Sequence, residues 1–220
     1  YTELVRELVR LVEESDSFLK GHSERVASYC SRFFKKLGLP KRELQKVYLA
    51  GLLHDIGMVY LPPDLVNKPG NLTDDELKLI QMHPVVAETI LSQVSVLKGV
   101  LPLIRHHHES YDGSGYPDGL QGNDIPLGAR IIAVMDSFCA MTADRPHRKA
   151  LGNEEALAEI EKNSGARYDP KLVKGFLQLV RPQSAAAASG SQAGTSEESG
   201  EQLDERSEEH TSELQSLLII

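Results

Sequence analysis

The stretch GLLHDIG at residues 51–57 carries an apolar segment directly into two side chains that bind metals well, His54 and Asp55. The residues before it have the apolar periodicity of a helix over 41–54 that faces a protein interior. A carboxylate carried into an interior is costly unless hydrogen bonds or a cation meet it. The pair is therefore expected either to lie exposed at the end of the helix or to meet a positively charged partner inside the protein.

The charge of the chain is distributed unevenly. The 220 residues, 40% of them hydrophobic, suffice for one medium domain with a core and carry a formal net charge of −8. Eight acidic and two basic residues follow Val180, so the rest of the chain is nearly neutral at −2, which argues against a reader of duplex DNA. Cys30 and Cys139 are too few for a disulfide framework and fit a reducing cytosol. No apolar run reaches the length of a membrane span.

Helical periodicity covers almost every patterned segment, and no alternating strand pattern competes with it, so the predicted class is all-α. Thr73 and Glu76 have the spacing of a capping box, and a loop rich in glycine, aspartate and proline is expected over 110–126. The expected helices span 1–14, 22–37, 41–54, 74–97, 100–108, 127–143, 153–163 and 170–180.

Several core-facing polar residues lie on these helices or at their ends. A single histidine on an apolar face is more often a hydrogen-bonded core residue than a ligand, but Asp136 falls in the middle of an apolar helical stripe and demands a partner. Together these residues favour one shared cluster of divalent metals, because imidazole suits transition metals and carboxylates can bridge two ions. The candidate ligands are His22, His54, Asp55, His83, His107, His108 and Asp136.

A set of motifs in fixed order makes the chain similar to a known family. They are HSERV at 22–26, HDIG at 54–57, HP at 83–84, HHESYDGSGYPDGL at 107–120, ARIIAVMDSFCAMTADRPHR at 129–148 and GARYDPKLV at 165–173. Over residues 15–180 the sequence resembles the HD-GYP family of cyclic di-GMP phosphodiesterases. The resemblance implies an HD-type helical bundle with a Gly/Pro-rich GYP loop.

Carried over residue by residue, the resemblance implies metal ligation by the seven candidates, with Asp55 as the bridge between two divalent transition-metal ions. Iron or manganese is favoured, with magnesium, zinc and nickel as alternatives. Tyr116 would lie on the substrate side, and Arg145 and Arg148 would bind substrate phosphate. Asp55, Tyr116 and Arg145 are the expected catalytic residues. His106 is interpreted as incidental, because the family pattern uses the two histidines that follow it.

The implied activity is hydrolysis of cyclic di-GMP to pGpG or GMP through a metal-bridged hydroxide. Phe18 stands where members with a third metal carry Glu, which argues for two ions. Met58 and Cys139 stand where the family has Lys and Asp. Joint loss of a charge pair is tolerable, whereas loss of one member would strand a buried charge. The alternative is therefore a catalytically weak module that binds cyclic di-GMP as a signalling effector. A phosphohydrolase acting on another nucleotide is a third interpretation.

The chain is expected to divide into four parts. Residues 1–14 form a helix that continues from a missing upstream region, 15–180 the HD-GYP domain, 181–205 a disordered acidic tail, and 206–220 a translated sequencing adapter that is not native. Expected partners besides cyclic di-GMP are an upstream sensory or receiver domain and a second copy bound through the N-terminal helix. The expected location is the bacterial cytoplasm.

Overall fold

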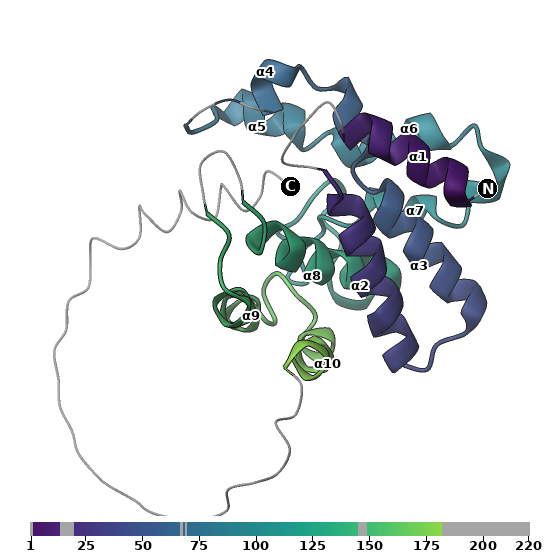
Figure 1. Cartoon of the computed structure of the whole chain (residues 1–220). Coiled ribbons are helices and arrows are strands. Elements are labelled where there is room, and N and C mark those ends of the chain that lie inside the picture. The colour runs from purple at the N-terminus through teal and green to yellow at the C-terminus, as the bar shows by residue number, and fades with distance from the viewer. Residues whose placement is uncertain (1, 14–19, 67, 69, 145–148, 182–220) are drawn as a thin grey trace, which may run out of the picture.

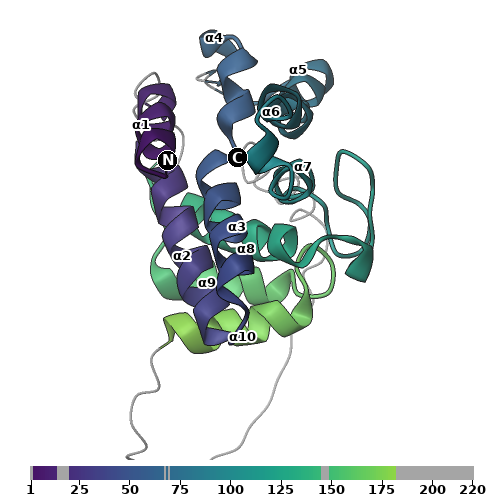
Figure 2. The same ribbon diagram turned by 90° about the vertical axis from the view of Figure 1, so that its right-hand side faces the viewer.

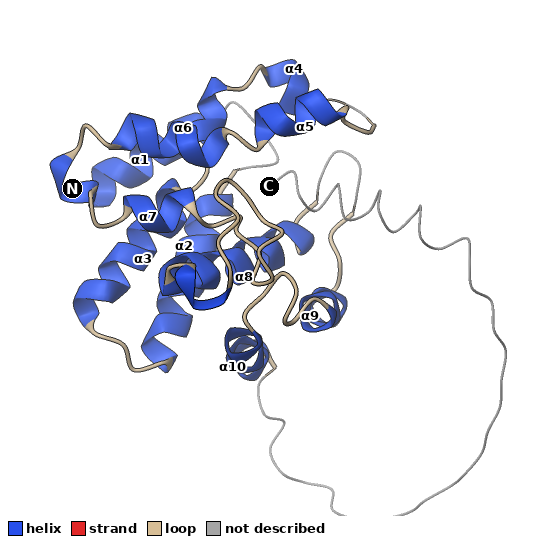
Figure 3. Ribbon diagram, turned by 180° about the vertical axis from the view of Figure 1, so that it is seen from behind, coloured by secondary structure: helices blue, strands red, loops and turns tan. Residues whose placement is uncertain are grey.

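The computed structural model describes residues 2–13, 20–66, 68, 70–144 and 149–181, and every regular element in these ranges is a helix (Figures 1 and 3). This confirms the all-α prediction. The tail segments proposed from the sequence, apart from Arg181, lie outside the described residues, as do Phe18, Arg145 and Arg148. None of the described helices is long and apolar enough to cross a membrane.

The elements follow one another in this order: α1 (Thr2–Glu13), α2 (His22–Lys36), α3 (Lys41–Leu53), η1 (Ile56–Tyr60), α4 (Pro63–Val66), α5 (Asp74–Ile80), α6 (His83–Leu91), η2 (Ser95–Leu97), α7 (Leu101–Arg105), η3 (Gly122–Asp124), α8 (Leu127–Met141), α9 (Asn153–Lys162) and α10 (Pro170–Val180). The η elements are short 3₁₀ helices.

Helix α8 forms the centre of the bundle, where α2, α3, α7, α9 and α10 all contact it (Figures 1 and 2). Nearly all its side chains are buried, as expected for a helix that is apolar all round. Phe138 of α8 meets Phe176 of α10 edge to face with 5.2 Å between ring centroids, and Phe176 meets Phe33 of α2 at 6.3 Å. These aromatic contacts join α2, α8 and α10.

The single helix predicted over 74–97 is wrong, because the chain divides there into α5, α6 and η2. The capping box of Thr73 and Glu76 opens α5 as predicted. The break falls just before Pro84, which has no N–H to continue the hydrogen-bond ladder to the carbonyl of Ile80. That carbonyl instead accepts a 2.8 Å hydrogen bond from Nδ1 of His83.

The helix predicted over 100–108 is also too long. Helix α7 ends at Arg105, and His106, His107 and His108 lie in a turn. The carbonyl of Ile104, which a continuing helix would offer to the N–H of His108, accepts a 2.6 Å bond from Nδ1 of His107. In both corrected segments the Nδ1 of a histidine donates to a backbone carbonyl that a continuous helix would pair with a backbone N–H. The remaining predicted helices agree with the structure to within about two residues.

We expect Gly57→Ala to destabilise the fold by about 1–3 kcal/mol or more, because a Cβ there overpacks the contact between η1 and α6. It would lie 2.0 Å from the carbonyl oxygen of His83 and 2.8 Å from the nitrogen of Ala87. Gly99→Ala is the control, since its Cβ would meet only the flexible end of Lys46, at 3.4 Å. Thermal melting measures both variants, and equal melting temperatures would contradict the contact.

Candidate metal centre

The structure brings all seven predicted ligands into one buried cluster, so His54 and Asp55 are not exposed at the end of the helix. None of the seven is more than 8% exposed. They converge from the start of α2, the end of α3, the start of α6, the turn after α7 and the middle of α8: His22, His54, Asp55, His83, His107, His108 and Asp136.

The cluster consists of two groups of donors that meet at Asp55. The first contains His22, His54 and Asp136, and the second contains Asp55, His83, His107 and His108. Within each group one ligand atom per residue lies within 4.8 Å of all the others. A separation of this order lets the donors of each group share one ion.

Each carboxylate oxygen of Asp55 faces a different group. Oδ2 lies 3.1 Å from Nε2 of His54 and 4.0 Å from Nε2 of His22. Oδ1 lies 3.4 Å from Nε2 of His83 and 3.9 Å from Nε2 of His107. This is the placement that a carboxylate needs in order to bridge two ions.

Backbone carbonyls orient three of the histidines. Nδ1 of His54, His83 and His107 each donates to the carbonyl three residues earlier, at 2.9, 2.8 and 2.6 Å. Nδ1 carries a proton in these contacts and Nε2 faces the cluster, where each imidazole can offer a lone pair to a cation when it is in its neutral form. This outer hydrogen bond is typical of histidines that bind metals.

Several buried atoms of the cluster have no hydrogen-bond partner among the described residues: Nε2 of His54, Nε2 of His108 and Oδ1 of Asp55. Buried polar atoms without partners are rare and call for an explanation, which a bound ion would supply. The residues present therefore fit divalent cations, and the donor set of five imidazoles and two carboxylates is suited to transition metals.

The electrostatics differ among the donors: burial lowers the pKa of His54, but the carboxylates of Asp55 and Asp136 raise it above its usual value. Burial lowers the pKa of His107 to about 3, helped by the charges of His54 and His83, and burial likewise lowers that of His108. Burial also opposes ionisation of Asp136, but the hydrogen bond with His22 and the nearby imidazole of His54 hold its pKa below its usual range. His107 and His108 thus remain neutral, and Asp136 remains charged, near pH 7.

Tyr116 covers one side of the cluster. Its ring stacks on His108 with 4.8 Å between centroids and 23° between planes. Its N–H donates to the carbonyl of His108 at 3.2 Å, and its buried hydroxyl has no partner among the described residues. Burial raises the pKa of this hydroxyl well above its usual value, so Tyr116 acts as a neutral phenol.

The loop that carries Tyr116 is held by Glu109, a residue to which the sequence assigned no role. Its carboxylate accepts hydrogen bonds from the N–H groups of Asp118 and Leu120, at 2.8 and 3.0 Å. Gly115 packs so closely on Ser110 that a Cβ would lie 2.1 Å from its nitrogen. These contacts link positions up to eleven residues apart inside an irregular loop, and periodicity gives no signal of them.

His106 lies outside the cluster, which agrees with its exclusion from the ligands, but it has a structural contact. Its Nε2 lies 2.9 Å from Oδ2 of Asp118, which also accepts a hydrogen bond from Nε of Arg105 at 2.7 Å. Arg105 reaches Glu88 of α6 at 2.6 Å as well. His106 therefore helps to attach the GYP loop to α6 and α7.

The predicted phosphate contacts Arg145 and Arg148 lie outside the described residues. The guanidinium whose charge acts on the Tyr116 hydroxyl is that of Arg167, in the turn before α10. Its backbone carbonyl accepts from the N–H of Tyr111 at 3.1 Å, so this turn is docked on the GYP loop. Arg167 lies within the stretch GARYDPKLV, but its place in that pattern assigns it no role.

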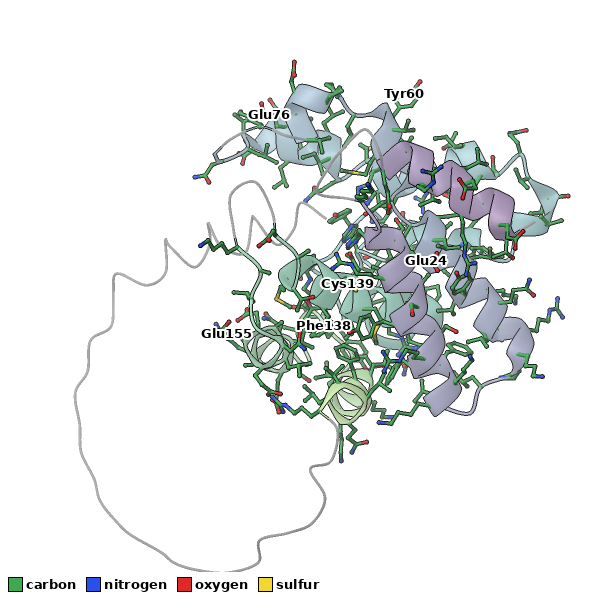
Figure 4. All side chains as sticks on the ribbon, viewed as in Figure 1. Glu24, Tyr60, Glu76, Phe138, Cys139 and Glu155 are labelled. Carbon is green, nitrogen blue, oxygen red and sulfur yellow. The ribbon has the colours of Figure 1, made fainter. Side chains whose placement is uncertain are left out.

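Met58 and Cys139 occupy different surroundings. Met58 lines a small cavity with Val9, Glu13 and Asp55, among others. Cys139 is 1% exposed, and burial raises the pKa of its thiol to about 12, with a further contribution from Asp136 (Figure 4). Neither replacement removes a donor from the cluster.

Comparison with known proteins agrees with this geometry. Residues 6–172 match the family model described as HD domain. The chain is 37% identical to the cyclic di-GMP phosphodiesterase response regulator RpfG of Xanthomonas campestris, over 80% of this chain and 47% of that protein. It is 39% identical to the 3'3'-cGAMP-specific phosphodiesterase 1 of Vibrio cholerae, over 68% of this chain and 35% of that protein. The chain thus spans about half the length of these relatives or less.

Among solved structures, a cyclic GMP-AMP specific phosphodiesterase of V. cholerae, V-cGAP3, has a similar fold, with a TM-score of 0.68 at 23% identity. The similarity covers 83% of this chain and 49% of that one. The HDIG stretch, the paired histidines and the GYP loop occupy one site in the matched domain. The chain therefore belongs to the HD domain family, in its HD-GYP branch.

Proposed function

We propose that this domain holds two divalent transition-metal ions and hydrolyses a phosphodiester bond of cyclic di-GMP. The observation that carries the proposal is the position of Asp55, whose two carboxylate oxygens face two separate groups of buried donors. The names of the relatives support the reaction class.

In this proposal His22, His54 and Asp136 hold one ion, His83, His107 and His108 hold the other, and Asp55 serves both. The two ions, when bound, lower the pKa of a water and stabilise charge that develops on the phosphoryl oxygens. The chain's own part is to keep His107 and His108 neutral and to fix the imidazoles of His54, His83 and His107 through backbone carbonyls.

Iron or manganese is the favoured metal, because a donor set of five imidazoles and two carboxylates suits these ions. Magnesium, by contrast, is typically bound through oxygen atoms alone. Zinc and nickel remain alternatives within the same donor chemistry. Seven donors, one of them bridging, account for two ions. This number agrees with Phe18, which stands where family members that bind a third metal carry Glu.

On the substrate side, the neutral hydroxyl of Tyr116 is proposed to donate a hydrogen bond to the nucleotide. Arg145 and Arg148 are proposed to bind phosphate by bidentate contacts. The product is pGpG, or GMP after a second cleavage. A second candidate substrate is 3'3'-cGAMP, because several relatives are phosphodiesterases named as specific for it.

The setting of the domain belongs to the same proposal. Since the relatives are about twice as long, we propose that an upstream sensory or receiver domain accompanies this one and that two copies pair through α1. A bacterial cytoplasmic location fits the two buried free cysteines.

We expect purified protein to hold close to two transition-metal ions per chain and to hydrolyse cyclic di-GMP faster than 3'3'-cGAMP. Asp55→Asn should lose most of the metal and nearly all turnover, because it removes the charge shared by both ions. Asp75→Asn, at a side chain that is 96% exposed on α5, is the control and should match the parent. Elemental analysis and nucleotide chromatography measure both. Full metal content in Asp55→Asn would refute the shared centre, and metal retention without turnover in the parent would favour the effector-binding alternative.

We expect Cys139→Asp alone to destabilise the protein by about 3 kcal/mol, because it buries a second carboxylate near Asp136. Met58→Lys should cost less stability than a lysine in a purely apolar cavity, since Glu13 and Asp55 are among the residues that line the same cavity. If the two introduced side chains interact, the double variant should be more stable by about 0.5–3 kcal/mol than the summed stability changes of the two single variants imply. It should also hydrolyse cyclic di-GMP faster than the parent. Melting curves and rates of all four proteins measure this, and strict additivity would show that the positions do not meet.

A further inference from the structure

Helix α1 reaches the metal centre through Glu13. This residue is only 7% exposed although it is charged. Its Oε2 accepts a 2.7 Å hydrogen bond from the N–H of Gly21, and its Oε1 accepts a 2.8 Å bond from the N–H of Ser23. Both carboxylate oxygens are therefore bound to the two backbone donors on either side of His22.

Glu13 takes the place of a helix cap. Gly21 is the N-cap of α2 and has no side chain, so the first turn of the helix lacks a local acceptor for its free N–H groups. A carboxylate at a helix N-terminus also interacts favourably with the helix dipole. The acceptor here comes from a different helix, so the start of α2 is fixed relative to α1.

A second contact between the same two helices supports this arrangement. Nε of Arg6 lies 3.3 Å from Oε2 of Glu24, in the first turn of α2, and donates to the hydroxyl of Tyr48 at 2.9 Å. That hydroxyl in turn donates to Oε1 of Glu24 at 2.9 Å. Glu24 is labelled beside α2 in Figure 4. Helix α1 thus holds the first turn of α2 from two points, before and after His22.

His22 depends on this support more than His54, His83 and His107 do. Nδ1 of His54, His83 and His107 is oriented by a backbone carbonyl, whereas Nδ1 of His22 is buried and has no partner among the described residues. The ring is oriented by the backbone at the start of α2 and by the contact of its Nε2 with Oδ1 of Asp136, at 3.0 Å.

We propose that Glu13 is a positioning residue of the metal centre, which fixes the ligand His22 by binding the N–H groups on either side of it. The proposal rests on the metal centre proposed above. It makes α1 a support of the centre, so that a displacement of α1 relative to α2 changes the position of one ligand.

Co²⁺ titration without nucleotide tests the proposal, followed by the d–d absorption of the bound ion. Glu13→Ala should weaken Co²⁺ binding about tenfold or more, as loss of an outer-sphere contact does. Glu13→Gln, which keeps one acceptor oxygen at the same length, should fall between Glu13→Ala and the parent. Glu7→Gln, on the exposed side of α1 where Glu7 pairs with Arg10, is the matched control and should bind like the parent.

Hydrogen exchange of residues 20–25 gives a second readout, measured well below the melting temperature of each variant. Faster exchange there together with weaker Co²⁺ binding supports positioning. Faster exchange with unchanged Co²⁺ affinity would overturn it, since Glu13 would then serve stability alone. Loss of half the bound Co²⁺ at saturation would overturn it too, because Glu13 would then be a ligand. If the parent binds no Co²⁺, the metal centre itself is refuted and this proposal with it.

Discussion

The carboxylate of Asp55, buried at the end of α3, is the constraint to which the surrounding elements respond. A buried charge needs partners, and the partners here are imidazoles that no single helix could supply. Helices α2, α3, α6 and α8 and the turn after α7 each direct a donor to this point. The helix ends and breaks that make the bundle irregular are what place polar side chains inside an apolar core.

One local device recurs at three of these positions. At His54, His83 and His107 the chain leaves or interrupts a helix, and the carbonyl freed three residues earlier binds the imidazole of the histidine itself. The break in the backbone and the orientation of the ligand therefore have one cause. Gly57 and Gly115 serve the same region by close packing, since each lies against the backbone that carries a histidine or the residue after one.

The sequence predicts the class of the fold and the membership of the site well, for different reasons. Apolar periodicity locates the helices, core-facing polar residues raise the seven donors as candidates, and the resemblance to the HD-GYP family implies that they bind metal. The errors fall where a side chain competes with the backbone ladder, as at His83 and His107, because periodicity continues through the break. Glu13 and Glu109 were missed because each acts through hydrogen bonds to the backbone of a distant segment, and no pattern of residue types records such a contact. A charged residue at the end of an amphipathic helix, such as Glu13, otherwise indicates only a solvated position.

The replacements at Met58 and Cys139 leave the donor set of the cluster unchanged. All seven donors are present and oriented without help from either position, so the capacity to hold metal does not depend on the missing Lys and Asp. Cys139 of α8 is buried in the core as a small apolar residue. Met58 lines a cavity together with Glu13 and Asp55, among others. A thiol that stays protonated adds no charge beside Asp136. The absence of a carboxylate at 139 therefore avoids burying a second negative charge near Asp136, so this replacement is tolerable whether or not a lysine stands at 58.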